Sequence, residues 1–160
     1  MAAPACPHAD ALPGQVSYRA LGKATHCLVN VERRRHGRSA LRSDGRLSRA
    51  ARGHARDMVS YNYFGHTSRS GVGSTSRILR TGYTRGARRW SVGENIAWGA
   101  DGRSTPRAIL RAWMNSPSHR RNILSRRFSE VGVAAVPGAP VRGGHPTEAT
   151  FVHDFGRVRP

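Results

Sequence analysis

The middle of this chain has the sequence Trp90-Ser91-Val92-Gly93-Glu94-Asn95-Ile96-Ala97-Trp98. The run predicts a strand or extended segment built around Gly93 and Glu94. Hydrogen-bonding side chains lie here beside glycine and aromatic residues, and three other segments set such a side chain beside glycine, proline or aromatic residues. Those segments are Tyr63-Phe64-Gly65-His66-Thr67-Ser68, Trp113-Met114-Asn115-Ser116-Pro117-Ser118-His119-Arg120 and Val152-His153-Asp154-Phe155-Gly156. The four segments together contain the candidates for a functional site.

Four helices are predicted around this run, because apolar side chains recur at helical spacing and start and stop residues flank them. They begin at Ser17, at Ser43 or Asp44, at Ser74 and at Thr105. The first helix extends to Arg35 before Gly37, and the third ends at Gly82. Pro106 suits the first position of the fourth helix, and Pro117 is expected to end it.

Two β-rich runs close the chain, at residues 130–136 and 149–158. A loop rich in proline and glycine separates them at residues 137–146, and we expect it to be mobile. Helices followed by strands, with one sheet to cover, predict an α+β sandwich of two or three layers. Parallel βαβ winding is not indicated.

The charge is strongly positive: the formal net charge is +18, and Lys23 is the only lysine among the basic residues. Such a balance would attract nucleic acid, anionic lipid or acidic cell-wall polymers. The arginines are scattered through every segment, however, as a compositional bias would also produce. Because no nucleic-acid motif accompanies them, we expect no specific nucleic-acid partner.

Two cysteines, Cys6 and Cys27, match no metal-ligand spacing. A disulfide between them would close a loop of about 20 residues and stabilise the fold by about 3 kcal/mol. It would tie a leader, residues 1–16, to the first helix and indicate an oxidising compartment. The alternative is two free buried thiols.

The first residues, Met1 to Pro13, contain no apolar signal-peptide core, and no stretch is apolar enough to cross a bilayer. A removed signal peptide would reconcile this with the disulfide. We therefore expect a secreted, extracellular protein without a membrane span, and we expect a monomer.

The order and spacing of the four segments resemble the bacterial branch of the CAP superfamily, also called SCP or pathogenesis-related-1-like proteins. The resemblance extends from about Cys27 to Gly156 and includes Leu28-Val29-Asn30 and Asn122-Ile123-Leu124. It implies a three-layer α-β-α sandwich with a central antiparallel sheet, formed by residues 17–160.

The resemblance also implies a cleft in which two histidines and two acidic residues meet and hold a divalent metal in some members. His66 matches the first histidine, Glu94 the first acidic residue and His119 the second histidine. The fourth position departs from the pattern, since Met114-Asn115-Ser116 contains no glutamate.

Two interpretations of these residues stay open. His66, His119 and Glu94 supply enough ligands for Zn²⁺ with one position left for water, and the two histidines are the first candidates. The same groups can instead form a hydrogen-bond network that pins a loop to the sheet.

Three further residues are assigned structural roles: Asn95 as a loop-fastening amide, His54 as a core histidine and Trp113 as a core or cleft-lining aromatic. His153 and Asp154 are expected near a sheet edge, as structural or surface residues.

The leading hypothesis is a secreted, non-enzymatic module that binds a lipid, a sterol or a cell-envelope component. One alternative is a metal-dependent hydrolase of peptides or cell-wall material, with Glu94 as general base. Another is a basic protein that attaches to anionic cell-surface polymers. No Ser-His-Asp or Cys-His arrangement strengthens the catalytic alternative.

Overall fold

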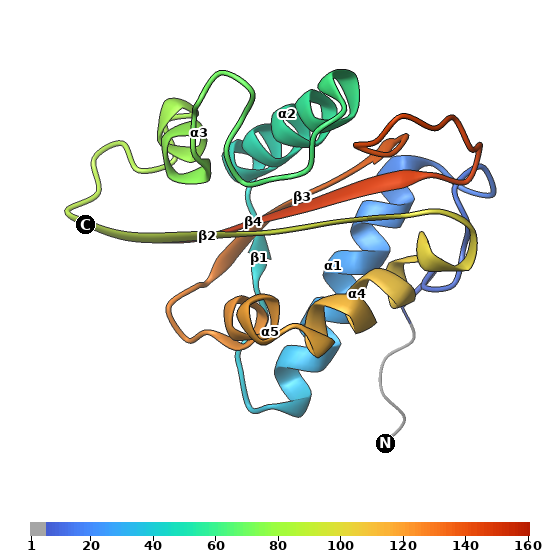
Figure 1. Ribbon diagram of the computed structural model, residues 1–160. Coiled ribbons are helices and arrows are strands. Elements are labelled where there is room, and N and C mark those ends of the chain that lie inside the picture. The colour runs from blue at the N-terminus through green and yellow to red at the C-terminus, as the bar shows by residue number, and fades with distance from the viewer. Residues whose placement is uncertain (1–5) are drawn as a thin grey trace.

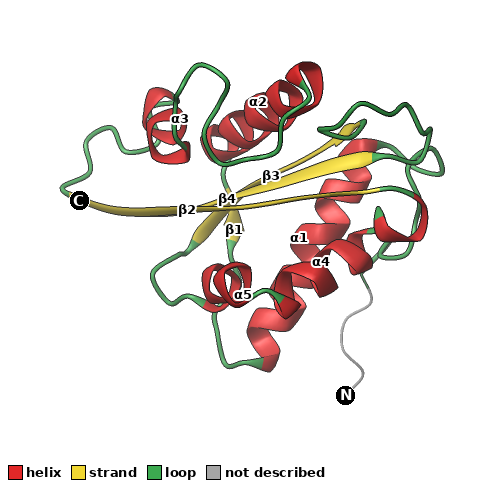
Figure 2. Cartoon of the chain, viewed as in Figure 1, coloured by secondary structure: helices red, strands yellow, loops and turns green. Residues whose placement is uncertain are grey.

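The structure, a computed structural model, describes residues 6–160 as a sheet covered by helices on both faces (Figure 1). Helices α1, α4 and α5 lie on one face, and α2 and α3 lie on the other (Figure 2). The elements are α1 (Tyr18–Arg35), β1 (Arg42–Ser43), α2 (Gly45–Tyr61), α3 (Ser74–Arg80), β2 (Arg89–Gly99), a 3-10 turn η1 (Asp101–Arg103), α4 (Pro106–Asn115), α5 (Pro117–Leu124), β3 (Glu130–Pro137) and β4 (Ala149–Arg159). The predicted α-β-α sandwich is thus confirmed.

Local chemistry starts the three longest helices where the sequence predicts. The Ser17 side chain accepts a hydrogen bond from the Ala20 amide in α1, and the Asp44 carboxylate accepts from two amides at the start of α2. The Thr105 side chain accepts from the Ala108 amide, and Pro106 follows it at the first position of α4. Each cap satisfies an amide that the first turn leaves unpaired.

One helix was not predicted. Pro117 ends α4 as expected, but it also occupies the first turn of α5, where a missing N–H costs nothing. A buried arginine of α1 holds the far end of α5: Arg33 is 2% exposed, and its Nη1 donates to Ile123 O at 2.6 Å and Ser125 O at 3.0 Å. The contact joins segments 90 residues apart, so local periodicity could not reveal it.

The sheet has the strand order β1-β3-β4-β2. Strand β2 pairs antiparallel with β4 along its whole length, from Arg89 opposite Arg159 to Gly99 opposite Ala149. Strand β3 pairs antiparallel with the other side of β4, and the short β1 pairs in parallel with β3. The central antiparallel sheet is therefore present, with one short parallel strand at its margin.

The expected edge position of His153 and Asp154 is wrong. Both residues have no exposed surface, because β4 lies between β2 and β3. Strand β4 is the last element in the sequence, but it does not lie at the edge, because β2, from the middle of the sequence, pairs with the side of β4 that β3 leaves unpaired.

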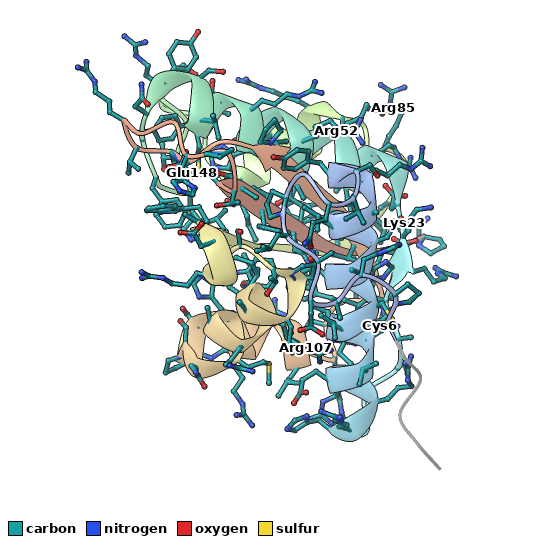
Figure 3. All side chains as sticks on the ribbon, turned by 90° about the vertical axis from the view of Figure 1, so that its right-hand side faces the viewer. Cys6, Lys23, Arg52, Arg85, Arg107 and Glu148 are labelled. Carbon is teal, nitrogen blue, oxygen red and sulfur yellow. A yellow bond between two sulfur atoms is a disulfide. The ribbon has the colours of Figure 1, made fainter. Side chains whose placement is uncertain are left out.

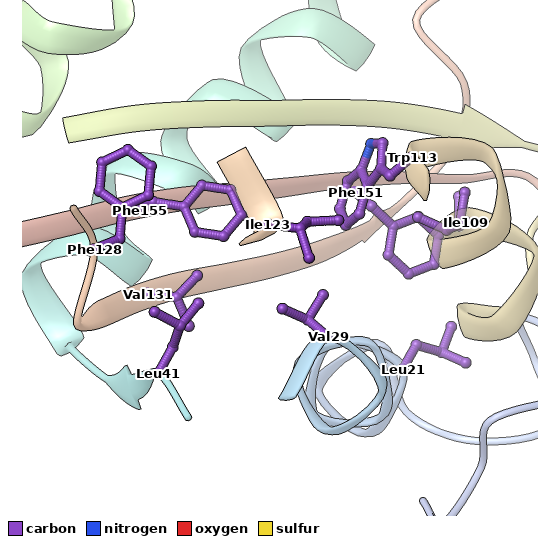
Figure 4. Close-up of a cluster of buried hydrophobic side chains, with 11 residues drawn as sticks. Leu21, Val29, Leu41, Ile109, Trp113, Ile123, Phe128, Val131, Phe151 and Phe155 are labelled. Carbon is purple, nitrogen blue, oxygen red and sulfur yellow. The ribbon is translucent and has the colours of Figure 1, made fainter. Parts of the chain in front are cut away.

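The hydrophobic core has a part on each face of the sheet. Side chains of α1, α4 and α5 pack against Phe151 and Phe155 of β4, as Figure 4 shows. On the opposite face, Ala51, Ala55 and Met58 of α2 pack against Val152. Because side chains alternate along a strand, β4 contributes to both parts.

The N-terminal segment is fastened to the helices that cover one face. Cys6 and Cys27 form a disulfide, which joins this segment to α1. Arg107 of α4 forms an ion pair with Asp10 at 2.7 Å; Figure 3 labels Cys6 and Arg107. Among residues 6–160, no helix is long and apolar enough to cross a bilayer.

Glycine permits the close crossing of α2 over β3. A Cβ atom at Gly132 would lie 2.0 Å from the carbonyl carbon of Leu47, where neither backbone has room to move. We expect Gly132→Ala to lower the free energy of unfolding by about 1–3 kcal/mol or more. Urea unfolding followed by circular dichroism measures the change.

Gly53→Ala is the matched control, because a Cβ at this exposed position in α2 meets no atom within 4 Å. We expect it to stabilise the protein by about 0.5–1 kcal/mol through helix propensity. Equal effects of the two variants would contradict the packing argument.

Candidate functional site

Glu94 is the centre of the candidate site. It lies on β2, and its side chain is only 1% exposed. His66 Nδ1 lies 2.8 Å from Glu94 Oε1, and Arg77 Nη2 donates to Glu94 Oε2 at 2.8 Å. Both carboxylate oxygens are therefore engaged by residues from outside the sheet.

The loop between α2 and α3 presents His66. Arg77 Nη1 donates to His66 O at 2.9 Å and to Val72 O at 2.7 Å. On the other side, His54 Nε2 donates to Gly65 O at 2.7 Å. Burial lowers the pKa of His54, which keeps its ring neutral. His54 thus fastens the loop that carries His66.

The charge of Glu94 is set by its partners. Burial alone raises the pKa of Glu94, but the hydrogen bond with His66 and the positive charge of Arg77 outweigh burial. The pKa of Glu94 is lowered as a result, so the group is a carboxylate at neutral pH.

Asp154 is the residue of β4 that lies directly opposite Glu94 in the pairing of β2 with β4. Among residues 6–160, neither oxygen of its fully buried carboxyl group meets a hydrogen-bond donor. Burial and the negative charge of Glu94 raise the pKa of Asp154 well above its ordinary value. The two groups thus differ: Glu94 is the carboxylate, and its negative charge disfavours ionisation of Asp154.

His119 approaches from the opposite face of the sheet, on α5. Asn95 Nδ2 donates to His119 O at 3.1 Å, and Asn122 Nδ2 donates to Glu94 O at 3.2 Å and Asn95 Oδ1 at 3.0 Å. These bonds tie α5 to β2. Burial, followed by the positive charge of His66, lowers the pKa of His119, so its ring is neutral at pH 7.

The site therefore crosses the outer edge of the sheet, where β2 has β4 as its one neighbour. His66 and Glu94 are in direct contact, whereas His119 is coupled to His66 only through its charge. The cavity of about 700 Å³ between α1 and α2 is lined by none of the three.

The donor set does not fit the zinc site that the resemblance implies. Among residues 6–160, no three His, Cys, Asp or Glu side chains lie close enough to hold a metal ion. Arg77 occupies one oxygen of Glu94 with a fixed positive charge, which repels a divalent cation. The stretch after Trp113, where the resemblance implies the second acidic residue, carries Met114, Asn115 and Ser116.

The residues assigned structural roles lie around this site. Trp113 is 1% exposed, and its indole N–H donates to Ile96 O at 3.1 Å. His153 is fully buried with its ring 4.8 Å from Trp113, and burial lowers its pKa well below the ordinary value. Neither ring nitrogen of His153 has a partner among residues 6–160.

Sequence reasoning missed three functional side chains: Arg77, Asn122 and Asp154 in its role opposite Glu94. Arg77 was indistinguishable from the many other arginines, because its role depends on folding back onto β2. Asn122 lies three residues after His119. Its closeness in the sequence to a candidate site residue is the one local signal that could have predicted its role.

The sequence matches the CAP family, the cysteine-rich secretory protein family, over residues 27–154. The uncharacterized protein YkwD of Bacillus subtilis is 38% identical over 114 residues, which cover 71% of this chain and 42% of YkwD. The uncharacterized membrane protein YlbC of the same organism is 36% identical over 107 residues, covering 66% of this chain and 29% of YlbC. The chain thus spans less than half the length of these curated relatives.

Solved structures share the fold. An extracellular protein of Bacillus anthracis that contains an SCP domain superposes with a TM-score of 0.67 and 27% identity, over 91% of this chain and 44% of that protein. An outer surface protein of Borrelia burgdorferi superposes with a TM-score of 0.74 over 90% of this chain and 97% of that one. At 19% identity, the second likeness shows the fold alone.

The raised pKa of Asp154 makes stability depend on pH. The Asp154 carboxyl group favours the folded state most below its unfolded pKa of about 4, and this contribution is lost as pH rises towards the folded pKa. Asp154→Asn has nearly the same shape as the parent residue and carries no ionisable proton. Its stability relative to the parent protein should therefore increase from pH 4 to pH 8 by about 1.4 kcal/mol for each unit of raised pKa.

Urea unfolding at several pH values, with chelator present, measures this difference. Val152→Ala is the control, because it changes a buried residue of the same strand without removing a titratable group, so its stability difference should be flat with pH. A flat difference for Asp154→Asn as well would contradict the raised pKa of Asp154.

Proposed function

This chain belongs to the CAP (cysteine-rich secretory protein) family, and we propose that it is a secreted, non-enzymatic module that binds a lipid, a sterol or another cell-envelope ligand. The observation that carries the proposal is the engagement of Glu94 by Arg77 and His66, each at 2.8 Å. The site presents hydrogen-bonding imidazoles to a ligand, and it has no free carboxylate to activate water.

The engagement of Glu94 argues against catalysis by this residue. A general base works best when its pKa lies near the operating pH and a lone pair faces the substrate. The pKa of Glu94 is lowered, and its side chain is 1% exposed with both oxygens in contact with partners. The metal-dependent hydrolase would further need a ligand set that these residues do not form.

Two accessible features support binding. The His66 side chain is 54% exposed, and with Nδ1 directed to Glu94 its Nε2 remains available to a ligand oxygen. Phe64, two residues earlier in the same loop, is 48% exposed. An exposed imidazole and an exposed aromatic ring in the same loop suit a ligand with a polar head and an apolar body.

The location outside the cytoplasm rests on the disulfide. The bond between Cys6 and Cys27 persists in an oxidising compartment and would be reduced in most cytosols. The Bacillus anthracis protein of similar structure is described as extracellular, which agrees with this proposal. The net charge of +18 would draw the protein to the anionic surface of a cell.

A binding experiment with His66→Ala tests the proposal. The panel contains phosphatidylcholine vesicles, the same vesicles with phosphatidylglycerol or with sterol, and purified cell wall. We expect the parent protein to bind saturably to at least one of these. Loss of one imidazole hydrogen bond should weaken binding about tenfold, equivalent to about 1.4 kcal/mol. Sedimentation of the protein with vesicles or wall fragments measures the affinity.

His145→Ala is the matched control, because it removes an imidazole that is 52% exposed from a loop away from the site. It should leave the affinity unchanged. Equal affinity of His66→Ala and the parent protein would contradict the proposed site, and the absence of saturable binding would contradict the function. Stoichiometric zinc together with hydrolysis abolished by Glu94→Gln would favour the enzyme instead.

A further inference from the structure

A second candidate site lies at the end of the sheet where the C-terminus emerges (Figure 1). It is a pocket of about 590 Å³ formed where three separate segments meet: the start of β2, the connection from α5 to β3, and the end of β4. We call it the arginine pocket. Its lining residues are Arg88, Arg89, Trp90, Ser91, Arg126, Arg127, Arg157 and Arg159.

The pairing of β2 with β4 gathers these charges. Arg89 lies directly opposite Arg159, and Ser91 lies opposite Arg157. Side chains of residues two apart point to the same face of a strand, so Arg89, Arg157 and Arg159 share one face. Arg157 Nη1 donates to Arg126 O at 3.4 Å, which brings the connection from α5 onto that face.

This arrangement costs stability in the absence of a ligand. Like charges directly opposite in an antiparallel pair are destabilising, and Arg89 and Arg159 form such a pair. No residue that lines the pocket is acidic. Across residues 6–160, the arginines that form ion pairs are Arg35, Arg42, Arg46, Arg77 and Arg107, and none of them lines it. Residues 6–160 thus place no acidic side chain in an ion pair with the arginines of the pocket.

We propose that the arginine pocket binds an anionic cell-envelope polymer through its repeated phosphate or carboxylate groups. Planar guanidinium groups form paired hydrogen bonds with both kinds of group, and several arginines on one face can hold successive charges of one chain. The pocket is large enough for a short stretch of polymer.

An envelope polymer suits the pocket better than a nucleic acid does. Proteins that hold single strands stack bases on aromatic rings, and Trp90 is the aromatic residue that lines the pocket. Its side chain alternates with that of Arg89 along β2, so it points to the opposite face of the sheet from Arg89, Arg157 and Arg159. The disulfide also indicates a compartment in which envelope polymers are the abundant polyanions.

The arginine pocket is independent of the proposed ligand site. None of its lining residues contacts His66, Glu94 or His119 among the hydrogen bonds of residues 6–160. Failure of either proposal would therefore leave the other standing, provided that the two sets of variants are measured side by side.

The experiment measures affinity for poly(glycerol phosphate), polygalacturonate and uncharged dextran, by titration calorimetry at 50 mM and 200 mM salt. The pocket variant carries Arg89→Gln, Arg157→Gln and Arg159→Gln. We expect the parent protein to bind one or both polyanions but not dextran, and the polymer bound identifies the charged group. The pocket variant should bind at least about tenfold more weakly at low salt and depend less on salt.

The matched control carries Arg49→Gln, Arg52→Gln and Arg56→Gln, which remove the same charge from the exposed side of α2; Figure 3 labels Arg52. It should retain the parent affinity to within about twofold. An equal loss in both variants would overturn the proposal, because binding would then follow net charge alone. Equally tight binding of a 20-nucleotide DNA strand would overturn the choice of polymer.

Thermal unfolding without polymer guards against a folding defect. The pocket variant should unfold at the same temperature as the parent protein or higher, since it relieves repulsion between Arg89 and Arg159. His66→Ala should leave polyanion binding unchanged. A pocket variant with lower stability and weaker binding is replaced by Arg159→Gln alone, for which retained parent affinity would overturn the proposal.

Discussion

The pairing of β2 with β4 along their whole length is the constraint on which the rest of the structure depends. Its register sets Glu94 opposite Asp154 in the interior and Arg89 opposite Arg159 at the end of the sheet. It also makes β4 an inner strand, so that helices must cover both of its faces. One set of backbone hydrogen bonds therefore positions both the buried carboxyl pair and the arginine pocket. A shift of one residue would reverse the face of every side chain in β2.

Arg77 changes what the resemblance to the family implies about the site. Two histidines and a glutamate are typical metal ligands, and their positions in the sequence match the family pattern. In the folded protein the guanidinium of Arg77 donates to one oxygen of Glu94, while Asp154 lies opposite Glu94 on β4 with a raised pKa. The Glu94 carboxylate, which is buried and already paired, stabilises the loop and positions His66. A carboxylate in this state does not activate water. This difference favours binding over catalysis.

The positive charge of the chain has two different environments. Many arginines are exposed and scattered, as a compositional bias would leave them, and they account for general attraction to anionic surfaces. Others are used individually: Arg33 is buried against the end of α5, and Arg77 neutralises Glu94. The lining of the arginine pocket is a third case, because its charges are gathered and unpaired. A protein that binds a lipid or envelope ligand at one site and a polyanion at another would be held at the cell surface by both.

The sequence by itself determined the helix starts, the long strands and the family. Caps and periodicity act within a few residues, so Ser17, Asp44 and Thr105 mark helix starts whatever the tertiary arrangement of the helices. Four ordered motifs also predicted His66, Glu94 and His119 as the candidate site residues. Tertiary structure alone decided the inner position of β4, helix α5 after Pro117, the ion pair of Arg77 and the gathering of arginines. These features depend on contacts between distant segments, and local residue patterns contain no signal for which distant segments will meet.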